Sequence, residues 1–480
     1  MKATDQSGTW NEETRAPRAL VFFSGARVSV RFMGHPPMLE IRQKSIGPRR
    51  ASREVVKRTA LASFALSLVV SSGLALAPRT ARAADWPIVT ATEEGSKDTP
   101  FRFFGFAQVV GEANVLGSRV TGLAAPKLRQ YEGQWATFNT LPDSDATWGL
   151  SVRRLRPGVR GSVPGTNQKI TYIATVELGR AGVTRLTPAT PMDVGITFSY
   201  IPGARLRIGQ FKLPLSDEVV EANPLASEFV NYSNVASQLL LESQVKNGVI
   251  TSNAYGFRDL GVEAFESFSL GKKLSLAYAF MVSQGRMGAV DDDPEKDVSG
   301  RVTTSWVFSG KRSDAHRQEL SLYVWGLHGT REYAGARAQR NRSGMGVSLE
   351  LEPVRLRAEV VSAQGMVAIG GQPPFEGAQV AMAPNGRALG IVAFARVRLG
   401  GHVLLKLRYD ELHRQTESTP DTRIFRTLTP ALEVQVTPKM RLMLDYERRW
   451  ILAPDATADA KRIVDTAGDR VMLQASVFLP

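Results

Sequence analysis

Apolar and polar residues alternate along most of the chain after residue 100. Between 192 and 200, Val194, Ile196 and Phe198 fall on one face, and small or polar residues fall on the other. The same period recurs in the segments 273–283, 402–410 and 440–447. A period of two residues belongs to a β-strand with one apolar and one polar face. We therefore expect strands, separated by clusters of Gly, Pro, Asp, Asn and Ser that mark turns.

This pattern predicts sixteen strands, at 101–114, 147–163, 168–179, 191–201, 204–212, 258–268, 272–284, 297–308, 318–329, 342–352, 354–366, 387–399, 402–415, 422–437, 440–452 and 468–480. Links after even-numbered strands are mostly tight, whereas those after odd-numbered strands include 115–146, 213–257 and 367–386. A soluble β-sandwich also alternates, but an even strand count with this loop asymmetry is typical of a bacterial membrane barrel. We predict an all-β fold, a transmembrane antiparallel β-barrel of about 16 strands with a long constriction loop.

The N-terminal part has a different pattern, with one long apolar run at 59–77. A basic stretch precedes this run, and Ala81-Arg82-Ala83-Ala84 follows it. A basic region, an apolar region and an A-x-A motif together describe a secretory signal peptide, and a membrane anchor is the alternative. We expect cleavage at Ala83 or Ala84. The predicted organisation is an N-terminal extension with signal peptide over 1–84, a short periplasmic lead over 85–100 and the barrel over 101–480.

The net charge of +14 would suggest a nucleic-acid partner if it belonged to one folded domain. Residues 1–84 carry 14 Lys and Arg against 5 Asp and Glu, which leaves 46 against 41 in the remainder. The barrel therefore has an ordinary charge balance, and we expect no nucleic-acid partner. The chain has no cysteine, and its 5 histidines show no metal-ligand spacing, so we expect no metal, no cofactor and no catalytic residue.

A family resemblance is carried by three stretches, which read RRLRPGVRG at 153–161, DVGITFSY at 193–200 and LRIGQFKLPL at 206–215. They resemble the phosphate-selective porins O and P, in which a basic R-R-x-R strand precedes a G-Q-F-K-x-P-F segment that opens a long loop. The resemblance implies a sixteen-stranded porin that is general or prefers anions. It also implies a homotrimer in the outer membrane of a Gram-negative-type cell, in contact with lipid and lipopolysaccharide, after export through the periplasm.

The polar faces of three predicted strands carry cations that we expect to line the pore as an anion path. They are Arg154, Arg156, Arg160, Arg205, Arg207, Lys212, Arg355 and Arg357. Arginine suits this role because it stays protonated and offers forked donors to oxyanions such as phosphate. The alternative is that these cations pair with Glu177, Glu359 or loop carboxylates, since a polar lumen contains both signs of charge.

Loop 213–257 is the longest link and contains acidic residues, including Asp217, Glu218, Glu221 and Glu228. Long loops of this kind usually carry function, so we expect it to fold into the barrel and constrict the pore. The alternative is an exposed rim loop. Passive diffusion of small anions is the predicted function, and a non-selective porin is the first alternative. A barrel enzyme using His328, His402 or His413 lacks a nucleophile motif, and a structural or adhesive barrel lacks a plug domain.

Overall fold

The computed structural model describes residues 100–138, 148–179, 189–222, 227–241, 256–285, 294–309, 317–333, 335–375 and 378–479, together with the backbone of two short strand pairs. The chain divides into two units, 1–76 and 77–480. In the first unit the described part is a hairpin of β1 (Phe22–Ser24) and β2 (Arg27–Ser29). The predicted signal cleavage at Ala83 or Ala84 lies outside the described residues.

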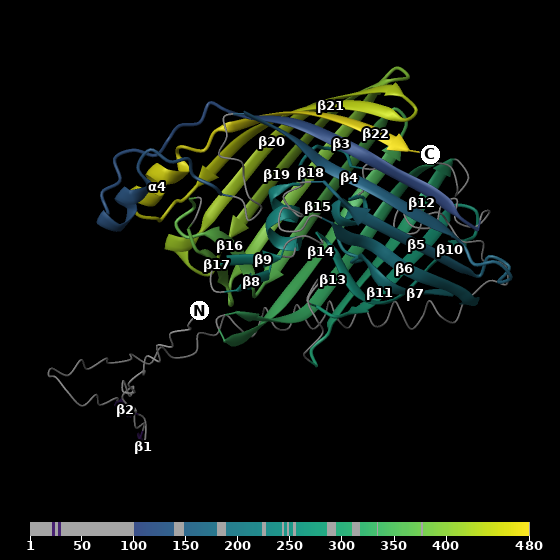
Figure 1. Ribbon diagram of the computed structural model, residues 1–480, viewed down its shortest axis with the longest axis horizontal. Coiled ribbons are helices and arrows are strands. Elements are labelled where there is room, and N and C mark those ends of the chain that lie inside the picture. The colour runs from purple at the N-terminus through teal and green to yellow at the C-terminus, as the bar shows by residue number, and fades with distance from the viewer. Residues whose placement is uncertain are drawn as a thin grey trace, which may run out of the picture. The chain divides into compact units, whose positions relative to one another are not determined.

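The second unit contains a closed barrel of sixteen strands (Figure 1). The strands are β3 (Arg102–Val115), β4 (Trp148–Ser162), β5 (Ile170–Glu177), β6 (Thr190–Ile201), β7 (Ala204–Lys212), β10 (Arg258–Leu270), β11 (Leu274–Ser283), β12 (Asp297–Ser309), β13 (Gln318–Tyr333), β14 (Ala336–Leu351), β15 (Val354–Gln364), β18 (Arg387–Leu399), β19 (Val403–Arg414), β20 (Arg423–Thr437), β21 (Met440–Leu452) and β22 (Asp469–Leu479). Each strand pairs with its neighbours in an antiparallel manner, and β22 closes the barrel against β3 with Leu479 opposite Gly105. The predicted antiparallel barrel and all sixteen predicted strands are confirmed, whereas constriction of the pore by loop 213–257 stays a prediction.

The links between strands differ from the prediction in detail. Strands β13 and β14 continue past their predicted borders as far as the pair Tyr333 and Ala336, whereas the alternation predicts a link over 330–341. Two loops contain further hairpins, β8 (Gln244–Lys246) with β9 (Val249–Ser252), and β16 (Val367–Gly371) with β17 (Val380–Ala383). Short helical elements are η2 (Pro126–Tyr131), α3 (Asp217–Val220), η3 (Ala236–Leu240), η4 (Thr419–Asp421) and α4 (Ala458–Val464). In the described part of the chain, we find no helix of the length and apolarity that a membrane span requires.

The outer wall of the barrel is apolar and its inner wall is polar. On β19, Leu405 and Leu407 are 44% and 45% exposed, whereas the intervening Lys406 is 5% exposed. Aromatic side chains near strand ends are exposed on the outer wall, including Trp148, Tyr200, Trp306 and Trp450. An apolar outer wall with aromatic residues near its edges is the lipid-facing surface of a transmembrane barrel. The chain is therefore an outer-membrane protein.

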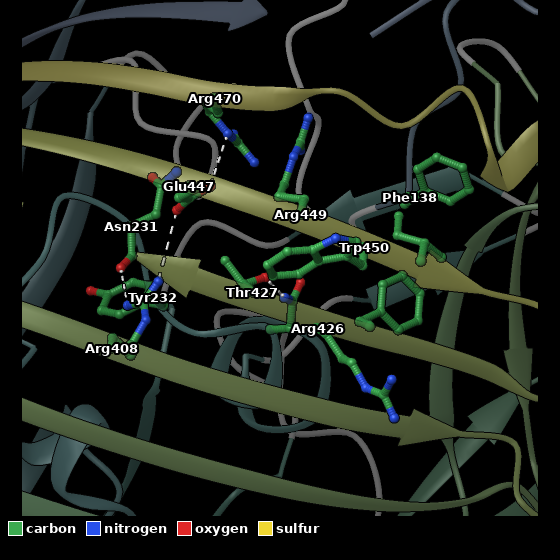
Figure 2. Close-up of a pocket in the computed structure, with 13 residues that line it drawn as sticks. Phe138, Asn231, Tyr232, Arg408, Arg426, Thr427, Glu447, Arg449, Trp450 and Arg470 are labelled. Carbon is green, nitrogen blue, oxygen red and sulfur yellow. Dashed lines mark hydrogen bonds and ion pairs between the residues drawn. The ribbon is translucent and has the colours of Figure 1, made fainter. Parts of the chain in front are cut away.

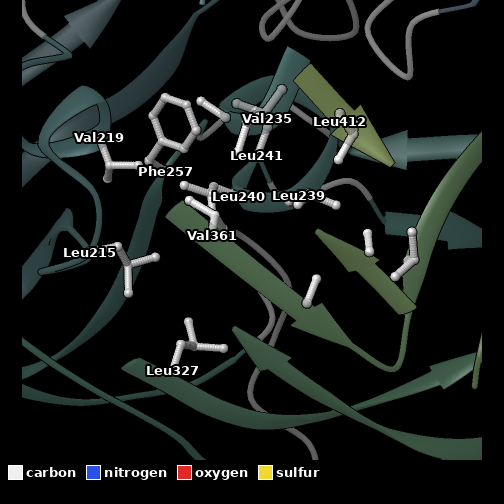
Figure 3. Close-up of a cluster of buried hydrophobic side chains, with 14 of the residues drawn as sticks. Leu215, Val219, Val235, Leu239, Leu240, Leu241, Phe257, Leu327, Val361 and Leu412 are labelled. Carbon is white, nitrogen blue, oxygen red and sulfur yellow. The ribbon is translucent and has the colours of Figure 1, made fainter. Parts of the chain in front are cut away.

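The described parts of the loop between β7 and β10, residues 213–222 and 227–241, lie inside the barrel. Its side chains contribute to an apolar cluster together with residues of the inner wall (Figure 3). Loop residues Leu215, Val235, Leu239 and Leu240 are each at most 1% exposed. The cluster also contains Leu327 of β13, Val361 of β15 and Leu412 of β19. The loop thus packs against several strands of the inner wall. This packing stabilises the loop because it removes apolar side chains from water.

Three loops at the long-loop rim pack on one another. Phe375, which follows β16, stacks on Tyr131 of η2 with ring centroids 4.5 Å apart, and Ile463 of α4 joins the same buried cluster. The Asp459 carboxylate of α4 accepts hydrogen bonds from the amides of Ala124 and Ala125 at 2.9 and 2.8 Å. These two backbone donors hold the pKa of Asp459 below its ordinary value. The three loops therefore form one cap at this rim.

Candidate functional site

The inner wall holds the backbone of loop 213–257 with charged side chains of both signs. Wall cations donate to loop carbonyl oxygens: Arg301 to Leu215 at 2.6 Å, Lys212 to Val220 at 3.1 Å, Lys406 to Glu228 at 2.8 Å, Arg408 to Asn231 at 2.8 Å and Arg342 to Leu239 at 2.8 Å. Wall carboxylates accept from loop amides, Asp445 from Val230 at 2.7 Å and Asp410 from Asn234 at 2.9 Å. These bonds satisfy buried backbone groups that loop residues cannot pair among themselves.

The loop carboxylates form ion pairs with wall cations on strands β12, β15, β18 and β19. Glu228 lies 2.8 Å from Arg355, 2.9 Å from Arg396 and 3.1 Å from Lys406. The other pairs join Glu221 to Arg355 and Arg357 at 2.6 and 2.5 Å, Asp217 to Arg301 and to Arg357, and Glu218 to Arg408 at 3.7 Å. The loop is thus attached by charge to four strands of the wall.

The ion pairs of Asp217 and Glu228 keep these two carboxylates charged at neutral pH. Burial by itself raises the pKa of Glu228, but Lys406, Arg355 and Arg396 outweigh burial and lower this pKa. Burial likewise opposes ionisation of Asp217, and Arg301 and Arg357 lower its pKa. A lowered pKa means that the attachment is fully present above the ordinary carboxyl pKa and is lost only as pH falls below it.

A strand glycine makes room for the tip of the loop. A Cβ atom at Gly390 of β18 would lie 2.6 Å from a methyl group of Val235. Real Cβ atoms do not approach other carbon atoms so closely, so any larger residue at 390 must displace the loop or the strand. Gly390 therefore fixes how closely the loop approaches this side of the wall.

Within the described part of the chain, five of the eight predicted pore-lining cations form salt bridges with carboxylates. Arg156 pairs with Glu177 at 2.8 Å, Arg205 with Glu266 at 2.9 Å, Arg207 with Glu263 at 2.5 Å, and Arg355 and Arg357 pair with the loop. Of the others, Arg154 donates to Gln108 and Tyr232, Lys212 donates to Val220, and Arg160 lies 4.9 Å from the ring centroid of Phe104. Glu359 instead accepts from Ser216 at 2.9 Å and Trp325 at 2.6 Å. The pairing alternative thus describes most of these cations, and the role of the set as an anion path stays a prediction.

Arg153 faces the lumen, although strict alternation along the predicted strand places it on the opposite face from Arg154. The pairing of β4 with β3 shifts at this point, because Arg154 is opposite Gln108 and Val152 is opposite Val109. Arg153 is the extra residue of a β-bulge, which re-aims side chains. It donates to Asn231 of the loop, while its neighbour Arg154 donates to Tyr232 at 2.9 Å. Two adjacent guanidinium groups therefore face the same loop segment.

Two hollows that differ in charge share Asn231 and Tyr232 of the loop as lining residues. The first, of about 470 Å³ and open to solvent, lies against β19 to β22 and is lined by Arg408, Arg449, Arg470 and Glu447 (Figure 2). Arg470 lies 3.1 Å and Arg408 3.8 Å from that carboxylate. The second, of about 490 Å³, is lined by Glu218, Glu221, Glu228 and Glu359 with Arg357 and Arg408. One hollow is thus basic and the other acidic.

No protein-family model and no curated protein matches this chain. Among solved structures, it is similar to an anion-selective porin from Comamonas acidovorans, with 11% identity and a TM-score of 0.49 over 80% of this chain and 100% of that one. It is also similar to Salmonella typhi OmpF in complex with daunomycin (11%, 0.48, 80% and 98%) and to the outer membrane channel DcaP of Acinetobacter baumannii (10%, 0.45, 79% and 97%). The function is therefore inferred from the residues of this chain.

A closed barrel with an apolar outer wall and a charged interior has the architecture of an outer-membrane channel. A barrel of sixteen strands is wide enough to enclose an aqueous path, and a loop inside it reduces the width of that path. Selectivity in such a channel depends on the charges of the inner wall and of the loop.

Proposed function

We propose that the chain is a porin for passive diffusion of small solutes, and that it prefers small anions, phosphate among them. We also propose that it works as a homotrimer, as the resemblance to the phosphate-selective porins implies. One observation carries the anion preference. Arg153 and Arg154 are adjacent, face the loop inside the barrel, and donate to the neutral groups of Asn231, Gln108 and Tyr232.

Two neighbouring positive charges influence ions across a narrowed path, since screening at 0.1 M salt acts over about 10 Å. The salt-bridged arginines add less, because the field of a cation is largely cancelled by a carboxylate within hydrogen-bonding distance. Five of the eight predicted cations are paired in this way. This pairing favours a general, non-selective porin as the second candidate.

The reversal potential across a salt gradient separates the two candidates. With purified protein in a planar bilayer and KCl at tenfold different concentrations, we expect the potential to have the sign of preferential chloride passage. Inorganic phosphate added to one side is expected to reduce the chloride current, because phosphate competes for the same guanidinium groups. A reversal potential near zero supports the non-selective porin, and a potential of the opposite sign contradicts the proposal.

The sequence of the N-terminal part supports export, and we propose residues 1–84 as a removed extension, 85–100 as a periplasmic lead and 101–480 as the barrel domain. The mature chain is expected to begin at Ala84 or Asp85, because the A-x-A motif ends the apolar run. Intact-mass measurement of the protein purified from outer membranes tests this. A mature form that retains residues 59–77 would contain an anchor in place of a signal peptide.

A further inference from the structure

The basic hollow combines guanidinium groups with aromatic side chains. We propose that it is a binding site for small organic anions that carry an aromatic or other apolar ring, and that it prefers them to inorganic phosphate. The inference rests on the proposed anion channel and adds a substrate class to it. The site lies between loop residues Asn231 and Tyr232 and the inner wall of strands β19 to β22 (Figure 2).

The cationic part of the site is formed by Arg408, Arg449 and Arg470, with Glu447 as the one carboxylate among the lining residues. Arg449 donates from its Nε to the carbonyl of Gly468 at 2.7 Å, which fixes the direction of its guanidinium group. Arg470 lies 3.1 Å from Glu447, and its side chain is 12% exposed. Arg408 also pairs with Asp410 at 3.3 Å and with Glu218 at 3.7 Å, so the positive charge of the hollow comes from Arg449 and Arg470. Two guanidinium groups against the Glu447 carboxylate leave an excess of positive charge, and oriented guanidinium groups favour a carboxylate or another oxyanion.

The apolar part of the site is formed by Phe138, Tyr232 and Phe425, with Ile451 beside them. Phe138 and Tyr232 are half-buried, so part of each ring is accessible, whereas Phe425 is 2% exposed. An inorganic phosphate gains nothing from such side chains, because it loses hydration without burying any apolar surface. A ligand ring gains both burial of apolar area and favourable ring contacts. The lining therefore favours an anion with a ring.

The charge of the acidic hollow favours the basic hollow as the binding site for an anion. The acidic hollow is lined by four glutamates and two arginines, so an anion is repelled from it relative to the basic hollow. Both hollows share Asn231, Tyr232 and Arg408. An anion that enters the lumen is thus directed toward Arg449 and Arg470.

The unmodified protein gives the primary test. Chloride current through single channels is recorded while benzoate, cyclohexanecarboxylate, acetate or inorganic phosphate is added to one side at equal ionic strength. We expect benzoate and cyclohexanecarboxylate to half-block the current at concentrations about three- to tenfold below those of acetate and phosphate, which is the range expected for one buried ring. Equal block by benzoate and acetate, or stronger block by phosphate, overturns the inference.

Variants locate the site. Phe138→Leu combined with Tyr232→Leu is expected to reduce the preference for benzoate over acetate to less than twofold, while Arg449→Gln weakens block by both anions. Phe280→Leu, on the exposed outer wall, is the matched control and is expected to leave every block unchanged. A benzoate preference that survives the double substitution in a folded channel places the site elsewhere. An anion-preferring channel without benzoate preference contradicts this inference alone, whereas a cation-preferring channel contradicts the proposed function.

Discussion

Deleting residues 217–252 and closing the gap with a short Gly-Ser linker is expected to raise the single-channel conductance roughly twofold or more. The loop lies inside the barrel, and its side chains form much of the apolar cluster against the inner wall. Removing it leaves the sixteen-stranded barrel intact, since each strand forms its backbone hydrogen bonds with its two neighbouring strands. Larger neutral sugars are expected to enter in liposome-swelling measurements. A folded deletion variant with the parent conductance would place the loop outside the current path.

The same deletion is expected to increase anion preference. The removed segment contains five acidic residues and one lysine, a net charge of minus four. The wall cations that pair with it, such as Arg357, lose carboxylate partners. The reversal potential in a salt gradient is therefore expected to move further toward that of a chloride-selective pore. An unchanged reversal potential would show that the loop carboxylates do not act on the permeating ions, and a shift toward cation preference would contradict the prediction.

A single substitution tests whether the position of the loop against β18 affects the current. Gly390→Val must displace Val235 or the strand, because the new Cβ atom would lie 2.6 Å from a Val235 methyl group. The open-channel current of this variant is expected to flicker between levels. Gly149→Val on β4 is the matched control, since a Cβ atom there meets nothing within 4 Å.

The barrel could be predicted from the sequence because its cause is local. A strand with lipid on one side and polar groups on the other must alternate with period two, and each such segment is readable by itself. The same reasoning placed Lys406 opposite Leu405 and Leu407 on β19, and the structure agrees. Strand ends are less predictable, as the β13–β14 hairpin shows, because polar residues also extend a strand beyond the membrane when a neighbour pairs with it.

The sequence offered Glu177, Glu359 and the loop carboxylates as partners of the predicted pore cations, and Arg156 does pair with Glu177. It could not predict which loop carboxylate meets which cation, because these partners lie in distant parts of the chain. Glu228 meets Arg355, Arg396 and Lys406, which lie 127 to 178 residues away in sequence. The direction of Arg153 depends on a bulge that only the pairing of β4 with β3 reveals. The sequence signal for this bulge is the pair of consecutive arginines in a predicted strand. Strict alternation would place one of the two toward lipid, where a charged residue is costly.

Changing Arg153 and Arg154 together to Gln is expected to move the reversal potential toward that of a non-selective pore and to weaken block by phosphate. Gln keeps a hydrogen-bonding amide near Asn231 and Tyr232. The substitutions therefore remove two positive charges and preserve hydrogen-bonding groups toward the loop. The matched control replaces the buried pair of Arg258 and Asp193, joined by two hydrogen bonds of 2.9 Å, with Gln and Asn. This control removes one charge of each sign, so it is expected to leave ion selectivity unchanged although it alters a buried ion pair. If the double arginine variant folds and keeps the parent selectivity, the two guanidinium groups hold the loop in place, and another part of the wall must supply the anion preference.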